Sequence, residues 1–278
     1  LEINADGTAR MAYADREVPW HRLGTPMKGL QTAEAMLEAS QADFDVVTTR
    51  VSVCDDNGEP LRNPDGTAVI VPDSRATVRV NSDGTFTGLA TVGTRYVVQQ
   101  NRECIDYALN IVGASNGDAV VDTAGVLHNG KGFFASIDMG ALVVDPNGVN
   151  DSIERYLLVR NGHDGKTAIT FANTSIRAVC QNTVTLGVQE AKRVFTARHT
   201  RNVERAIEQA NEVLNISNHW AQNFTKMAEK MLGISVPSGS SRLEKIIDNA
   251  FPLETGSTER QKKNRDEVIT LVRAIYEN

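Results

Sequence analysis

Residues 155–205 read RYLLVRNGHDGKTAITFANTSIRAVCQNTVTLGVQEAKRVFTARHTRNVER. Two runs rich in apolar and β-branched residues, YLLV and TAITF, are separated by Asn-Gly-His-Asp-Gly, which predicts two strands joined by a turn. A helical pattern replaces the strand pattern further along the stretch. Residues 151–205 hold nine Lys and Arg against five Asp and Glu, although the whole chain has a net charge of −6. The stretch therefore predicts a cationic α/β platform, and we expect the functional surface there.

The sequence before this stretch predicts mostly hairpin-connected strands. Between residues 44 and 92, β-rich runs are separated by Asp-Asn-Gly, Pro-Asp-Gly and Ser-Asp-Gly, and glycine accepts the positive φ that tight turns require. Further strands are expected at 119–127, 132–139 and 141–145. The pattern predicts an α+β fold: an antiparallel β-meander with packed helices, followed by a helical C-terminal part.

Two helices are expected among these strands. The first covers about residues 32–40 with Thr32 as its N-cap. The second begins at a capping Asn101 and ends at Gly113, and its apolar stripe should pack on the sheet. Residues 1–30 contain Pro19, Gly24 and Pro26, which favour an irregular arm that Trp20 anchors to the body.

The C-terminal part changes character after residue 200. Nine positions recur at steps of three and four residues from Val203 to Met231, which predicts a long amphipathic helix. Ser241-x-x-Glu244 and Thr258-x-x-Gln261 are capping boxes that predict two further helices. We expect three parts, at 1–30, 31–200 and 201–278, and a homo-oligomer in which part of the long seam contacts a neighbouring subunit.

The composition limits the classes of protein to which the chain can belong. The 278 residues are 41% hydrophobic, enough for a substantial core, and no apolar run is long enough to span a membrane. The three cysteines are odd in number and form no CxxC pair, which favours a reducing cytoplasm. No signal-peptide pattern is present, so we expect a cytoplasmic protein without a membrane partner.

One set of residues has the chemistry of a catalytic site. Cys180 is a possible nucleophile, His163 or His199 a base, and Asp164 an orienting group, and the histidines with Asp164 are possible metal ligands. The apolar neighbours of Cys180 favour a core cysteine, and Asp164-Gly165 is most simply a turn. Walker and dinucleotide-binding motifs are absent. We therefore predict no catalytic residues, no metal and no cofactor, and an enzyme is the less favoured interpretation.

The cationic run is the stronger signal. Tyr156, Phe171 and Phe195 accompany it, and cations interleaved with aromatic rings are the two components of single-strand binding that tolerates any sequence. A basic helix start above core aromatics gives the same pattern. From the residues alone, the two interpretations have equal weight.

Six ordered blocks carry a family resemblance: PWHRLGTPM (19–27), RYVVQQNRECIDYALNIVG (95–113), AGVLHNGKGFFASIDM (124–139), YLLVRNGHDGK (156–166), IRAVCQNT (176–183) and FTARHT (195–200). Over about residues 20–205 the chain resembles the phage/plasmid-like proteins that are grouped under a domain of unknown function. The resemblance implies a bacteriophage, prophage or conjugative plasmid as the source and the bacterial cytoplasm as the place of action. The architecture is also similar to that of single-strand annealing recombination proteins, a likeness of fold without a sequence motif.

We therefore expect a non-catalytic, oligomeric protein that binds single-stranded nucleic acid, DNA in the first place, and anneals strands in phage or mobile-element recombination. The expected phosphate contacts are Arg160, Lys166, Arg177, Arg193, Arg198 and Arg201. One alternative is a DNA-acting hydrolase that uses a metal or a cysteine. Another is a non-enzymatic phage protein that inhibits a host defence or forms part of the particle.

Overall fold

The computed structural model describes residues 1–29, 32–116, 120–144, 151–191, 193–205, 207–210, 226–227, 230, 241–252 and 258–277. The chain forms two compact units. The first comprises Leu1–Val144 with Asp151–Thr225, and the second Asp145–Asn150 with Lys226–Asn278. The expected division at residues 30 and 200 differs from this one, because the N-terminal residues and those just after 200 belong to the first unit.

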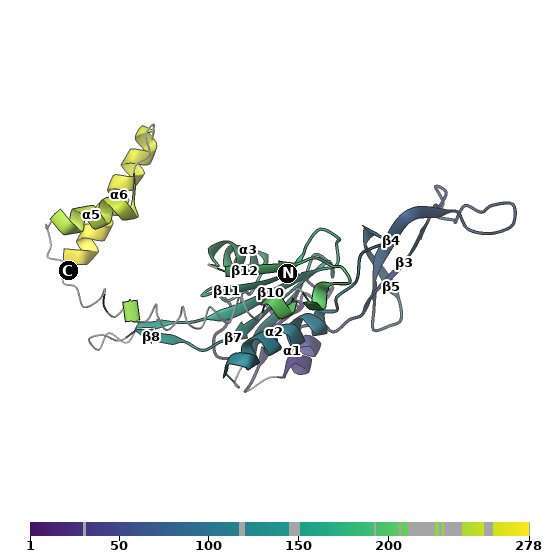
Figure 1. Cartoon of the computed structure of the whole chain (residues 1–278), viewed down its shortest axis with the longest axis horizontal. Helices are drawn as coiled ribbons and strands as arrows, with labels where there is room; N and C mark the ends of the chain where they lie inside the picture. Colours follow the sequence, from purple (N-terminus) through teal and green to yellow (C-terminus); the bar gives the residue numbers. More distant parts are fainter. Residues whose placement is uncertain are drawn as a thin grey trace. The chain divides into compact units, whose positions relative to one another are not determined.

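A seven-stranded sheet forms the centre of the first unit, in the order β12-β11-β10-β7-β6-β1-β2 (Figure 1). All its pairs are antiparallel except β1 with β2. Its strands are β1 (Met11–Ala14), β2 (Thr25–Met27), β6 (Val120–Leu127), β7 (Gly132–Asp138), β10 (Tyr156–Gly162), β11 (Ile169–Thr174) and β12 (Arg193–Ala197). A separate small pair consists of β8 (Leu142–Val144) and β9 (Asp151–Ile153). The predicted α+β class is confirmed.

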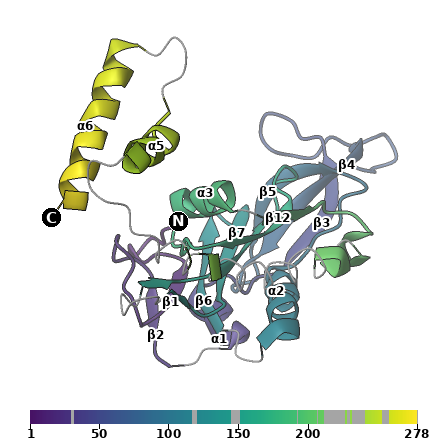
Figure 2. The same ribbon diagram turned by 60° about the vertical axis from the view of Figure 1, so that its left-hand side comes forward.

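Helices cover both faces of this sheet, which explains why its strands read as nearly continuous apolar runs. The helices α1 (Ala33–Ala39) and α2 (Asn101–Asn116) lie on one face, and α3 (Gln181–Glu190) lies on the other (Figure 2). Side chains alternate between the faces along a strand. On β10, accordingly, Leu157 and Val159 join the core cluster that α2 covers, whereas Leu158 joins the cluster that includes Val184 of α3.

A three-stranded antiparallel sheet, β3-β4-β5, extends from one end of the large sheet (Figure 1). Its strands are β3 (Val46–Ser52), β4 (Ile70–Val80) and β5 (Phe86–Gly93). The glycines of the three predicted turns, Gly58, Gly66 and Gly84, all have positive φ, as the sequence indicated. The strand β4 is continuous from Ile70 to Val80 and includes Pro72.

The N-terminal residues are not an irregular arm. Met11, Ala12 and Tyr13 are buried, and β1 pairs with both β6 and β2 inside the large sheet. Only three to four residues form each strand, too few for a recognisable alternation. Trp20 is 74% exposed and contacts only the ring of His21 edge-on among the aromatic residues described. The expected anchoring role of Trp20 is therefore wrong.

The two predicted helices of the body are present with one changed boundary. Thr32 caps α1 by accepting a hydrogen bond from the Ala35 N–H at 3.2 Å, as predicted. The helix α2 continues through Gly113 to Asn116, so glycine at 113 does not end it. Asn101 is its first residue rather than a cap, because the Asn101 amide is hydrogen-bonded inside the core.

The seam after residue 200 begins inside the core of the first unit. Val203, Ile207 and Ala210 are at most 5% exposed and belong to the cluster that α2 covers. The first unit itself therefore covers these three positions of the seam. The later seam positions, Leu214, Ser217, Ala221, Phe224, Ala228 and Met231, lie outside the described residues.

The second unit contains the predicted C-terminal helices, α5 (Ser241–Ala250) and α6 (Glu259–Glu277). The box at Thr258 is confirmed, because the Gln261 side chain accepts the Thr258 N–H at 2.8 Å and Thr258 Oγ1 accepts the Gln261 N–H at 3.3 Å. Ile247 of α5 and Ile269 of α6 are buried together. None of the helices in the described part of the chain combines the length and the hydrophobicity of a bilayer span.

Gly125 of β6 packs closely against Phe134 of β7. A β-carbon at this position would lie 2.6 Å from Cε1 of Phe134, whereas one at Gly88 of β5 would meet nothing within 4 Å. Phe134 is fully buried. We predict that Gly125→Ala lowers the free energy of unfolding by roughly 1–3 kcal/mol, the usual cost of overpacking.

The matched control is Gly88→Ala, which should change the free energy of unfolding by less than about 0.5 kcal/mol. Chemical denaturation of both variants measures the difference. Equal stabilities would show that β6 and β7 do not pack as described.

Candidate functional site

An open groove with a volume of about 1350 Å³ lies in the first unit. Asp73 of β4 and three segments far apart in the sequence form it: the end of β5 with the loop that leads to α2, the turn between β10 and β11, and the segment that follows β12. The lining residues are Asp73, residues 93–97, residues 165–168 and residues 198–202.

Four cations line this groove. Lys166, Arg198 and Arg201 were predicted phosphate contacts, and the fold brings them together with Arg95, which the sequence reasoning missed. All four residues are exposed, and none has an ion pair or a side-chain hydrogen bond with the residues that the structure describes. Asp73 is the single acid among the lining residues. The groove is therefore a cationic surface with unoccupied donors.

Hydrogen bonds between distant segments fix the walls of the groove. The Tyr96 hydroxyl donates to the Gly162 carbonyl at 2.9 Å, and the Val97 N–H donates to the His199 carbonyl at 3.0 Å. The hydroxyl of Thr77 in β4 donates to the His163 carbonyl at 2.7 Å. These bonds join the three-stranded sheet, the β10–β11 turn and the segment after β12 into one frame.

Two aromatic rings stack within this frame. The rings of Tyr96 and His199 have centroids 4.8 Å apart at an angle of 16°. His199 is 7% exposed, and neither of its ring nitrogens has a hydrogen-bond partner among the described residues. Burial lowers the pKa of His199, although the nearby backbone of Val97 and Thr167 and the charge of Asp164 act in the opposite direction.

A buried polar cluster lies behind the groove. The Asn101 amide nitrogen donates to the Ala42 carbonyl at 3.0 Å, so its oxygen is the acceptor for the His163 Nε2, 3.1 Å away. His163 therefore carries a proton on Nε2. Burial, with a smaller contribution from the neighbouring His199, lowers the pKa of His163 to about 4. The same Asn101 oxygen accepts from Asn161 at 3.3 Å.

Asp164 organises the turn between β10 and β11, as the Asp-Gly pair indicated. Its Oδ1 accepts the N–H groups of Lys166 and Thr167 at 2.9 and 2.7 Å, and its Oδ2 accepts the Thr167 hydroxyl at 2.9 Å. These hydrogen bonds outweigh the opposing effect of burial and lower the pKa of Asp164. Donors of the turn therefore occupy the carboxylate. The turn that it stabilises places Lys166 at the groove.

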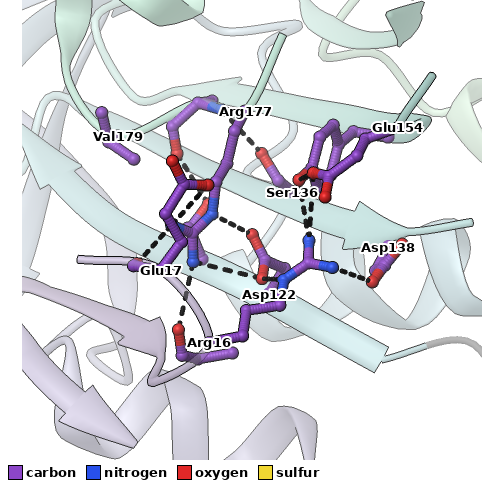
Figure 3. A network of polar contacts seen from close by, with 12 residues as sticks. Arg16, Glu17, Asp122, Ser136, Asp138, Glu154, Arg177 and Val179 are labelled. Atoms are coloured by element: carbon purple, nitrogen blue, oxygen red, sulfur yellow. Dashed lines mark hydrogen bonds and ion pairs between the residues drawn. The ribbon is translucent and has the colours of Figure 1, made fainter. Parts of the chain in front are cut away.

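Arg177 has a different environment from the other predicted contacts. Its Nε donates to Oδ2 of Asp122 at 2.6 Å, while Nε of Arg16 donates to Oδ1 of the same carboxylate at 2.9 Å (Figure 3). The Asp122 side chain is 2% exposed, and Arg16 also reaches Asp138 at 2.8 Å. Arg177 further donates to the Glu17 carbonyl at 2.6 Å. The network ties the end of β1 to the sheet, and we leave Arg177 out of the candidate surface.

The two remaining predicted contacts lie apart from the groove. Arg193 begins β12, where its partner in register is Asn173 of β11. It does not line the groove, nor does Arg160, which lines a smaller hollow next to it.

The aromatic residues expected to stack on bases are core residues. Tyr156 is 1% exposed and Phe171 is fully buried, and Phe195 packs against the α2-side core. The alternation of β10, β11 and β12 turns these rings inward. The stacking role expected of Tyr156 and Phe171 is therefore wrong.

Residues 88–277 match the model of a family described as a domain of unknown function, DUF932. The chain belongs to this family. No curated protein and no solved structure matches the chain. The DUF932 match includes all four cations of the groove, whereas Asp73, β1, β2, α1 and β3 precede it.

The proposed catalytic residues of this DUF932 chain are not assembled as a triad. Asp164 is engaged by its own turn, and His163 binds Asn101. Cys180 caps α3, where the Thr183 hydroxyl lies 3.6 Å from its Sγ and accepts the Cys180 N–H at 2.9 Å. Within the described ranges, no group of three His, Cys, Asp or Glu residues is placed to hold a metal ion.

The buried histidines make the stability depend on pH. An unfolded His163 has a pKa near 6.5, so between about pH 6.5 and 4 the unfolded chain binds more protons than the folded one. The free energy of unfolding should therefore fall as the pH falls through this range, by roughly 3 kcal/mol from His163. His199 adds to the same trend.

Denaturation at several pH values with His163→Gln tests this expectation. Glutamine can still donate to Asn101 but does not titrate, so the dependence on pH should flatten. The exposed His128 provides the control variant His128→Gln, which should keep the wild-type slope. An unchanged slope in His163→Gln would show that His163 is not buried and neutral.

Proposed function

We propose that the chain binds single-stranded nucleic acid, DNA in the first place, in the groove and promotes the annealing of complementary strands. The observation that supports this most is the set of four unpaired cations, Arg95, Lys166, Arg198 and Arg201, against the single Asp73 in one groove. The volume of about 1350 Å³ exceeds the roughly 300–1,000 Å³ of small-molecule pockets, which favours a polymer.

The mechanism requires no covalent step. Flexible, exposed cations neutralise phosphates and release counterions, which supplies affinity without selecting a sequence. Since Tyr156 and Phe171 are buried, the main attraction is to the backbone, and base edges stay free to pair with a second strand. Several copies whose grooves align would hold a longer strand than one subunit can, which is the role of the proposed homo-oligomer.

The context follows from the resemblance to phage/plasmid-like proteins. Mobile elements replicate and recombine through single-stranded intermediates, so an annealing protein would act on them in the bacterial cytoplasm. The net charge of −6 does not oppose this role, because screening over about 8 Å limits the influence of distant acids on the groove.

The dependence of affinity on salt tests the groove. Each phosphate contact on a single strand contributes about 0.7 to the slope of log affinity against log salt. Replacing Arg95, Arg198 and Arg201 together by Gln should lower the magnitude of that slope by about two. Fluorescence anisotropy with a labelled thymidine oligonucleotide measures it.

A charge-matched control replaces three exposed cations of α6 in the second unit, namely Arg260, Lys262 and Lys263, by Gln. This variant should keep the wild-type slope. A folded groove variant with an unchanged slope would contradict the proposed site. Equal changes of slope in both variants would show that binding depends on the overall charge of the chain and not on the groove.

Annealing should be independent of Cys180 and of metal. Cys180→Ser preserves the cap of α3, because serine is a preferred N-cap residue. The rate of annealing of complementary oligonucleotides, followed by energy transfer, should change less than about twofold in this variant and in the presence of a chelator.

A hydrolase would behave differently, because the loss of a nucleophile usually lowers the rate by orders of magnitude. Degradation of labelled DNA by the wild type that either Cys180→Ser or the chelator abolishes would favour the hydrolase and contradict the annealing proposal.

A further inference from the structure

A second, smaller hollow adjoins the groove. Its volume is about 110 Å³, and the two share Thr167 in the β10–β11 turn. The turn between β6 and β7, the end of β10 and the start of α3 complete its walls. The lining residues are Leu127, His128, Lys131, Gly132, Arg160, Asn161, Asp164, Thr167 and Gln181.

A pair of glycines allows the chain to pack closely beside the hollow. Gly132 of β7 and Gly162 of β10 are partners in register, so neither strand contributes a side chain at this point of the sheet. A β-carbon at Gly162 would lie 2.3 Å from Cβ of Thr167. The absence of both side chains allows the β10–β11 turn to fold closely over the end of the sheet and beside the hollow.

Two cations, Arg160 and Lys131, line this hollow. Arg160 follows Leu158 by two residues on β10 and therefore lies on the α3 face of the sheet. Lys131 directly precedes Gly132 and is exposed. Within the described part of the chain, neither side chain forms an ion pair or a hydrogen bond. By contrast, Arg16 and Arg177 elsewhere in the unit are held by Asp122.

Most of the other polar groups of the hollow have partners already, and the exception among the described residues is the buried Oδ1 of Asn161. The Asp164 carboxylate also lines it, but three donors of the turn occupy its two oxygens. His128 and Gln181 lie within hydrogen-bond distance of each other, with 3.2 Å between Nε2 and Oε1. Arg160 and Lys131 are thus the donors left to bind a ligand, and both favour an anion.

The size and charge of the hollow fit one phosphate group. A phosphate monoester carries a charge of about −1.5 to −2 at neutral pH, against −1 for a phosphodiester. The hollow has a net positive charge even with the Asp164 carboxylate in its lining, so it attracts the monoester more strongly. A volume of about 110 Å³, against about 1350 Å³ in the groove, leaves little room for the nucleosides on both sides of an internal phosphate. We propose that this hollow binds the terminal phosphate of a strand that lies in the groove.

This inference rests on the proposed function of the groove and adds the end of the strand as a recognised feature. The phosphate belongs to either the 5′ or the 3′ end, and the chemistry at Arg160 and Lys131 is the same for both. A protein that holds a strand end would favour strands cut by a nuclease that leaves a phosphate over strands without one.

Three oligonucleotides of one sequence test the inference: one with a 5′-phosphate, one with a 3′-phosphate and one with hydroxyls at both ends. The wild-type chain should bind one of the phosphorylated forms roughly tenfold more tightly than the hydroxyl form, as expected for charge-assisted hydrogen bonds. The preferred form identifies the end. The wild type is measured beside Arg160→Gln, Lys131→Gln and Arg198→Gln.

Arg160→Gln and Lys131→Gln should each remove most of the preference and change affinity for the hydroxyl form less than about twofold. Lys131 is exposed, so its variant keeps the test valid should Arg160→Gln fold poorly. Arg198→Gln in the groove should weaken the binding of all three oligonucleotides alike and keep the preference for the phosphorylated form.

The outcomes separate the two proposals. Equal binding of all three forms by the wild type, together with weaker binding by Arg198→Gln, would overturn the terminal site and leave the groove. An equal loss of affinity for all three forms in Arg160→Gln would make Arg160 an ordinary contact to the nucleic-acid backbone. This result would also overturn the terminal site. If no oligonucleotide binds, the proposed function and this inference both fail.

Discussion

The candidate site depends on a buried polar joint between the three-stranded sheet and the turn that follows β10. Thr77 and Tyr96 donate to the carbonyls of His163 and Gly162, at 2.7 and 2.9 Å. A buried donor or acceptor left without its partner costs about 1–3 kcal/mol, so the joint resists opening. Asn101, the first residue of α2, accepts from His163 in the same cluster. The distance between the groove walls is thus fixed by the same contacts that position a core helix.

The environment of each cation separates structural from binding roles. A buried guanidinium requires a counter-ion, because desolvation of an unpaired charge is expensive. Arg177 satisfies this requirement with Asp122, whose side chain is 2% exposed. The groove cations Arg95, Lys166, Arg198 and Arg201 are exposed and keep their hydration at little cost without a partner among the described residues. Such cations can bind a phosphate without first breaking an ion pair. A salt-sensitive contact to the nucleic-acid backbone requires this.

The sequence predicted the parts of the fold that local rules determine. Turn glycines such as Gly58 and Gly84, the Thr32 cap and the box at Thr258 follow from backbone chemistry within four residues. Short strands such as β1 have no readable period, and whether Arg177 meets Asp122, 55 residues earlier, depends on strand order. Arg95 was missed for the same reason, since it lies outside the cationic cluster in sequence and joins it only in the folded chain. The burial of Tyr156 likewise depends on which faces of β10 are covered. Because both faces are covered, Tyr156 is buried.

Photo-cross-linking tests the central claim, that the groove holds a nucleic-acid strand, most directly. A single-stranded oligonucleotide that carries 5-bromodeoxyuridine would be irradiated with the full chain, and the linked peptides identified by mass spectrometry. The account predicts cross-links within residues 93–97, 165–168 and 198–202, which line the groove. Cross-links confined to other surfaces, such as β3 or α6, would contradict it.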